Sequence, residues 1–176
     1  MPFIIAALGA LAALYFFVIR ARGAADMASE VLDAANDVRL AARRFGFTRK
    51  TNIHPVEAIE DPDIALASIG AAFVELDDLP TREQRDALSA AIAQTCELTL
   101  QDAEELGVLG RWMVGECGSP DQAIVRLSRK LFKLQGANGF APVMEVIKMV
   151  STAGSGSLSL KQKEALDDIS RAFKVT

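Results

Sequence analysis

The first nineteen residues carry no charged side chain, and apolar residues dominate this stretch. Phe3 to Ile19 would form about 26 Å of α-helix, which is enough to cross a thin bilayer. Arg20 and Arg22 follow directly, so the positive flank lies on the C-terminal side of the apolar stretch. The pattern predicts a single transmembrane anchor over residues 1–22, with the rest of the chain on the cytoplasmic face of the inner membrane.

A cleaved signal peptide is the alternative for this segment, because Gly23, Ala24 and Ala25 resemble a small-residue cleavage site. Signal peptides carry their positive charge before the apolar stretch, whereas the arginines here come after it. The order of charges therefore favours the anchor.

Small residues gather on one face of the predicted anchor. Gly9 and Ala13 are four residues apart, a spacing that lets a second helix approach closely. Packing against another membrane span is one hypothesis. The alternative is that alanine is simply common in short apolar helices.

Residues 23–46 show apolar positions spaced by threes and fours, which indicates an amphipathic stalk helix. These positions are Met27, Val31, Ala34, Val38, Ala41 and Phe45. The narrow stripe favours packing on a partner. Residues 47–61, which include His54-Pro55, are predicted to form a linker.

Residues 62–176 are divided by helix start and stop signals rather than by the alternation typical of strands. The starts are Asp61-Pro62, Thr81, Thr99, Ser119-Pro120, Phe140 and Ser159, and the stops include Gly118 and Gly136. Short links between these segments predict an all-α fold, a compact antiparallel helical bundle. The residues expected to face its core are Ile64, Ile69, Phe73, Leu76, Leu88, Ala91, Ile92, Cys96, Leu106, Leu109, Met113, Ile124, Leu127, Leu131, Leu134, Leu166, Ile169 and Phe173.

Two of the predicted helix starts are alike. The stretch from Thr81 to Leu88 aligns with the stretch from Ser159 to Leu166, and both begin with a Ser/Thr-x-x-Gln capping box. Each follows an apolar helix and a short turn. The domain is therefore predicted to contain a repeated helical hairpin.

An N-terminal span followed by this repeated hairpin resembles the TerB-like domains, a family that includes tellurite-resistance TerB and the N-terminal part of DjlA-type proteins. The resemblance covers residues 62–176 and rests on helix order and turn pattern. In the family, acidic turns of the form A-D-G-x-[IL]-[ST]-x-x-E suggest metal binding. Here the turn from Leu76 to Thr81 keeps its carboxylates but lacks the glycine, and the turn over 153–159 has no acid. The only His-Pro pair is followed by Val56 rather than aspartate, so the co-chaperone activity of DnaJ-like proteins is not implied.

Composition separates the chain into two parts. The protein is 51% hydrophobic, with a mean hydropathy of +0.22 that is high for a wholly soluble protein. Residues 1–50 carry seven Lys and Arg and four Asp and Glu, whereas residues 51–176 carry twelve and nineteen. An acidic domain repels phosphates, so nucleic acid is not an expected partner. The expected partners are membrane lipid and other membrane or cytoplasmic proteins.

Few residues point to chemistry. Glu75, Asp77, Asp78 and Glu83 form the densest acidic cluster, and oxygen ligands such as those of Asp77, Asp78 and Glu83 suit Ca²⁺ or Mg²⁺. A solvated, helix-capping turn that binds no metal is the more common explanation of such a cluster. Trp112, the only tryptophan, is either a core anchor or an exposed interface anchor. With one histidine, His54, the sequence offers no catalytic pair, and we expect neither enzymatic activity nor a cofactor.

The sequence therefore predicts a membrane-anchored, non-catalytic interaction or scaffold module on the cytoplasmic face. Two alternatives stay open. The chain is either an accessory structural subunit of a larger membrane complex, or a divergent metal-binding stress-response protein of the TerB type.

Overall fold

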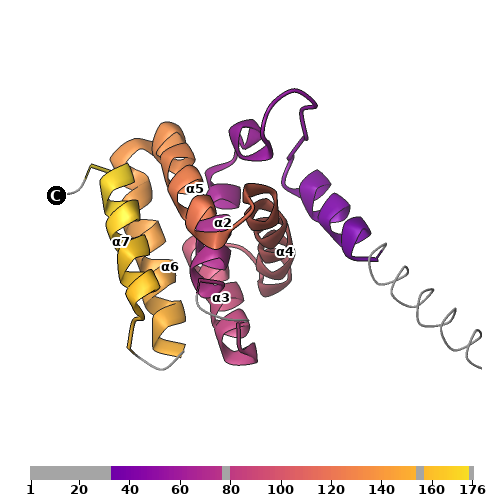
Figure 1. Cartoon of the computed structure of the whole chain (residues 1–176). Coiled ribbons are helices and arrows are strands. Elements are labelled where there is room, and N and C mark those ends of the chain that lie inside the picture. Colours follow the sequence, from indigo (N-terminus) through magenta and orange to yellow (C-terminus); the bar gives the residue numbers. More distant parts are fainter. Residues whose placement is uncertain (1–32, 77–79, 154–156, 175–176) are drawn as a thin grey trace, which may run out of the picture. The chain divides into compact units, whose positions relative to one another are not determined.

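The computed structural model describes residues 33–76, 80–153 and 157–174 (Figure 1). The chain divides into two units, Met1–Asp37 and Val38–Thr176. The described residues of the first unit, 33–37, are helical, and the helix continues to residue 44. The described residues contain helices and turns but no strand, which confirms the all-α prediction.

The second unit is a helical bundle. Its helices are α2 (Pro62–Val74), α3 (Arg82–Thr95), α4 (Leu100–Cys117), α5 (Pro120–Gln135), α6 (Phe140–Ala153) and α7 (Leu160–Ala172), with short 3-10 turns η1 (Pro55–Ala58) and η2 (Gly136–Gly139). The predicted caps form. Thr81 and Ser159 make full capping boxes, and the stops Gly118 and Gly136 have φ angles of +87° and +61°.

Helix α2 is the centre of the bundle (Figure 1). Every residue from Ile64 to Val74 is buried, and α4 and α5 make the most extensive contacts with it, while α3 and α6 also pack on it. A helix that is apolar all round has no face suited to water, so neighbours must cover each side. The backbones of α2 and α4 come close at Gly110, where a Cβ atom would lie 3.1 Å from the carbonyl carbon of Ala67.

The core residues expected from the pattern are confirmed. Most of them are fully buried, and Cys96, Leu134 and Leu166 are partly buried against the same core. Helix α3 packs on α6, and α7 packs on α5.

The segment indicated as a linker contributes to the core. Phe47, Val56, Ala58 and Ile59 are buried with the bundle residues. His54 caps the turn η1, because its Nδ1 atom accepts a hydrogen bond from the Val56 N–H at 3.3 Å. Val56, Ala58 and Ile59 do not recur with the period of a helix or a strand, so their packing was not predictable from the pattern of apolar positions.

Residues 38–50 are fixed to α4 by side-chain contacts. Val38, Ala41 and Phe45, part of the predicted apolar stripe, pack against the core. Arg44 forms ion pairs with Asp102 and with Glu105, the latter at 2.9 Å.

The predicted anchor over residues 1–22 lies outside the described residues, and with it Gly9, Ala13, Arg20 and Arg22. Residues 23–32 of the predicted stalk also lie outside them. Within the described ranges, no helix is both long enough and apolar enough to span a bilayer.

Candidate functional site

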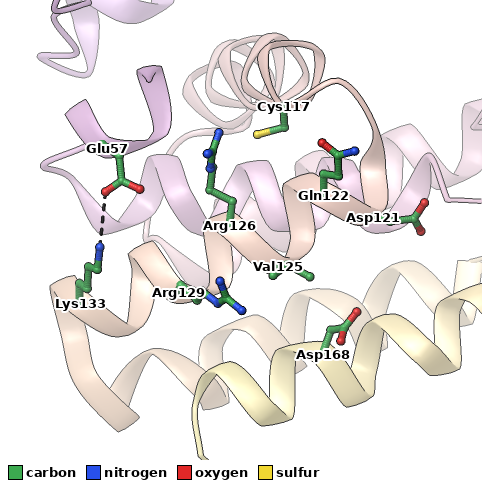
Figure 2. A pocket seen from close by; sticks show the side chains of 9 residues that line it. All are labelled: Glu57, Cys117, Asp121, Gln122, Val125, Arg126, Arg129, Lys133 and Asp168. Carbon is green, nitrogen blue, oxygen red and sulfur yellow. Dashed lines mark hydrogen bonds and ion pairs between the residues drawn. The ribbon is translucent and has the colours of Figure 1, made fainter. Parts of the chain in front are cut away.

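A groove of about 610 Å³ runs along the outer face of α5, and we call it the α5 groove (Figure 2). Its lining comes from η1, the end of α4, α5 and α7. The lining residues are Glu57, Cys117, Asp121, Gln122, Val125, Arg126, Arg129, Lys133 and Asp168. Segments far apart in the sequence thus meet at one surface.

The amphipathic character of α5 creates this surface. Ser119 caps the helix and Pro120 occupies its first turn, which fixes where the helix begins. Ile124, Leu127 and Leu131 are buried on one side. The opposite side carries the cationic residues Arg126, Arg129, Lys130 and Lys133. Residues three and four apart are neighbours on a helix, so these like charges repel one another.

Glu57 of η1 contacts two of these cations, one through its carboxylate and one through its backbone carbonyl oxygen. The Lys133 Nζ atom lies 3.5 Å from the Glu57 Oε2 atom, an ion pair drawn in Figure 2. The Lys130 ammonium donates a hydrogen bond of 2.9 Å to the Glu57 carbonyl oxygen. On the other side of the groove, Asp168 is paired with Arg171 of the same helix.

Arg126 and Arg129 are exposed and form no ion pair with any carboxylate in the described ranges. Figure 2 shows the Arg126 side chain extending from α5 toward Cys117. Burial raises the pKa of the Cys117 thiol, and the nearby Arg126 charge opposes this effect. The groove therefore presents two guanidinium groups that lack a described anionic partner.

A second cluster of titratable groups joins the start of α2 to the end of α3. Burial, together with the Asp63 and Asp61 carboxylates, raises the pKa of the Cys96 thiol to about 12. The pKa of Asp63 is also raised, by burial first and by Asp61 second, against a hydrogen bond with Cys96. A thiol with such a pKa is protonated at neutral pH and is a poor nucleophile.

A smaller groove of about 220 Å³ lies between the end of α2 and the facing sides of α3 and α4. Burial raises the pKa of its Glu75 carboxyl, and the positive charge of Arg111 partly opposes this. The Arg85 guanidinium donates a hydrogen bond of 2.7 Å to the Pro80 carbonyl oxygen at the rim.

The predicted metal ligands are only partly described. Asp77 and Asp78 lie outside the described residues. Glu83 is exposed in the first turn of α3, and hydrogen bonds from its own backbone N–H and from Thr81 lower its pKa. Over the ranges that the structure covers, no three His, Cys, Asp or Glu side chains are grouped so that they would hold a metal ion.

The two residues that the sequence singled out by their rarity have intramolecular contacts. Trp112 is partly buried, meets Phe47 edge to face, and has the Arg49 guanidinium carbon 5.6 Å from its ring centroid. Its role as an interface anchor stays a prediction. The second ring nitrogen of His54, Nε2, lies 3.0 Å from the Glu116 carbonyl oxygen.

Arg126 and Arg129 were not predicted as site residues from the sequence. Their spacing of three on the polar face of an amphipathic helix was the available signal. Neither the groove nor the pairing of their neighbours with Glu57 follows from that spacing, because η1 and α7 are distant in sequence.

Searches of family models, of curated proteins and of solved structures returned no match to this chain.

Proposed function

We propose that this chain is a non-catalytic interaction module that is tethered to a membrane by residues 1–22 and binds a partner protein through the α5 groove. The observation that carries the proposal is the pair of exposed arginines in the groove, Arg126 and Arg129, which lack an ion-pair partner among the described residues while Lys133 beside them has one. A groove of about 610 Å³ is within the size range of ligand-binding clefts.

The state of the potential catalytic groups supports a binding role rather than a chemical one. Nδ1 of His54 accepts from a backbone N–H and its Nε2 faces a backbone carbonyl, so both nitrogens serve the fold. The pKa values of Cys96 and Cys117 are both raised, which disfavours the thiolate form that attacks substrates.

The tether is supported by the sequence of residues 1–22, which places an uncharged stretch before two arginines. Its test is extraction of membranes with alkaline carbonate. The full chain is expected to stay in the membrane pellet, whereas a chain without residues 1–22 is expected in the supernatant. Recovery of the full chain in the supernatant would contradict the tether.

The binding function is tested by photo-crosslinking from the groove in intact cells. A benzophenone amino acid replaces Gln122, which is exposed and lines the groove. The same amino acid at Lys163, exposed on α7 outside the groove lining, is the control. We expect a discrete covalent adduct with one partner from position 122 and not from position 163. Equal adduct patterns from both positions, or none from position 122, would contradict the proposal.

A further inference from the structure

The four cationic residues on the polar side of α5, which we call the cationic row, differ in their contacts. Those in contact with Glu57 lie toward the C-terminal end of the helix. Lys130 and Lys133 both contact Glu57, through its carbonyl oxygen and its carboxylate. Arg126 and Arg129 lie earlier on the same row and form no ion pair with the described carboxylates. Among the described residues, the one direct ion pair of the row therefore lies at its C-terminal end, between Lys133 and Glu57.

We infer that the α5 groove binds an acidic peptide segment of the partner protein, with carboxylates of that segment paired to Arg126 and Arg129. This inference rests on the proposed function and names the chemistry of its partner. A guanidinium offers a planar fork of donors that matches a carboxylate in two parallel hydrogen bonds. The two forks leave one helix in different directions, Arg126 toward Cys117 and Arg129 on the side of Asp168 (Figure 2), so a segment that crosses the groove can reach both.

The shape and charge of the surroundings favour a narrow peptide over an extended anionic surface. Asp121 and Asp168 line the groove beside the arginines, and Glu57 lies at its end toward η1. A lipid headgroup plane or a nucleic acid duplex would bring rows of phosphates against these carboxylates. A single extended segment can place its carboxylates over the arginines and leave the flanking acids in water.

The test uses the full chain in a mild non-ionic detergent and two fluorescein-labelled peptides of ten residues. One alternates glutamate with serine, and the other alternates glutamine with serine. Fluorescence anisotropy at low ionic strength is expected to show binding of the glutamate peptide with a Kd about tenfold or more below that of the glutamine peptide.

Charge-reversal variants locate the site. Arg126→Glu/Arg129→Glu is expected to raise the Kd of the glutamate peptide about tenfold or more. Arg39→Glu/Arg43→Glu makes the same change in net charge at two exposed arginines outside the groove, and is expected to change the Kd less than about threefold. Equal losses in both variants would show unspecific attraction and overturn the inference. Circular dichroism checks that each variant keeps its helices.

Competition separates carboxylate from phosphate recognition. Glutarate is expected to displace the glutamate peptide at lower concentration than inorganic phosphate does. The opposite order, or no binding of the glutamate peptide by the folded chain, would overturn the inference. A photo-adduct from position 122 that persists in Arg126→Glu/Arg129→Glu would support the proposed function. It would contradict the inference that an acidic segment pairs with these arginines.

Discussion

The indole ring of Trp112 on α4 and the phenyl ring of Phe47 meet edge to face, with centroids 5.8 Å apart and planes inclined at 64°. Ion pairs lie on either side of this contact, from Arg44 to Glu105 at 2.9 Å and from Arg49 to Glu116 at 3.2 Å. The ion pairs are exposed and contribute little individually, so residues 38–50 are held chiefly by apolar packing, to which the aromatic contact and the buried Ala41 both contribute.

Replacing Trp112 tests this attachment. Trp112→Ala removes the ring that Phe47 and Arg49 contact and is expected to lower the free energy of unfolding by about 2 kcal/mol. Trp112→Phe keeps an aromatic edge and is the matched control, with an expected loss below about 1 kcal/mol. Urea unfolding followed by circular dichroism gives both values. An unchanged stability in Trp112→Ala would mean that the indole serves another surface, such as the predicted interface.

The close approach of α4 to α2 is tested at two glycines on the same helix. A Cβ atom at Gly110 would lie 3.1 Å from backbone atoms of Ala67 and Ser68, which cannot move aside as a flexible side chain would. Gly110→Ala is therefore expected to lower the free energy of unfolding by about 1–3 kcal/mol.

Gly107 is the matched position, because a Cβ atom there would meet nothing within 4 Å. Gly107→Ala is expected to leave stability unchanged or to raise it by about 0.5–1 kcal/mol, since alanine is the better helix former. Thermal unfolding of the two variants side by side is the measurement. The same result for both would contradict the close helix crossing.

The raised pKa of Cys96 predicts slow alkylation. A thiol whose pKa is about 12 instead of 9.0 holds about a thousandfold less thiolate at pH 8. In a Cys117→Ser background, iodoacetamide is expected to modify Cys96 far more slowly in the folded chain than in urea. Mass spectrometry of timed samples gives the rates.

Asp63 is a cause of this raised pKa that mutation can remove. Asp63→Asn takes away its negative charge and is expected to lower the pKa of Cys96 and speed its alkylation. Asp167→Asn, at an exposed carboxylate on α7, is the control. Rates that respond equally to the two substitutions would rule out the Asp63 contact as the cause.

Glu75 predicts a pH dependence of stability. Its pKa in the folded chain is raised above the ordinary value of 4.5, chiefly by burial, so the folded chain holds the proton more tightly than the unfolded chain does. The contribution of Glu75 to stability is therefore greatest below pH 4.5 and decreases as the pH rises through the folded pKa.

Urea unfolding at several pH values from 4 to 7 measures this effect. Glu75→Gln cannot ionise and is expected to lose less stability over this range than the unchanged chain. Arg111→Gln removes the charge that lowers the pKa of Glu75, so the decrease is expected to extend to higher pH. Parallel curves for the unchanged chain and Glu75→Gln would contradict the prediction.

Helix boundaries were predictable because their signals are local. A side-chain oxygen at Thr81 or Ser159 reaches a backbone N–H three residues on, so four residues of sequence contain the whole interaction. The buried faces followed for the same reason, since a period of 3.6 sets which residues share a side of a helix.

The α5 groove was not predictable in this way. It exists because η1 and α7 lie beside α5, and the carboxylate of Glu57 reaches Lys133 from seventy-six residues away in the sequence. The spacing of Arg126 and Arg129 is ordinary for a solvated helix face. Only the three-dimensional arrangement distinguishes Lys130 and Lys133, which contact Glu57, from Arg126 and Arg129, which do not.

The complete burial of α2 has a consequence for biosynthesis. Residues Ile64 to Val74 emerge from the ribosome as a continuous apolar segment. The helices that contact it most extensively, α4 and α5, are synthesised later. Until Gln135 at the end of α5 has been translated, this apolar segment lacks part of its native packing partners. Chaperones that shield exposed apolar segments during translation are therefore expected to act here, ahead of any other part of the bundle.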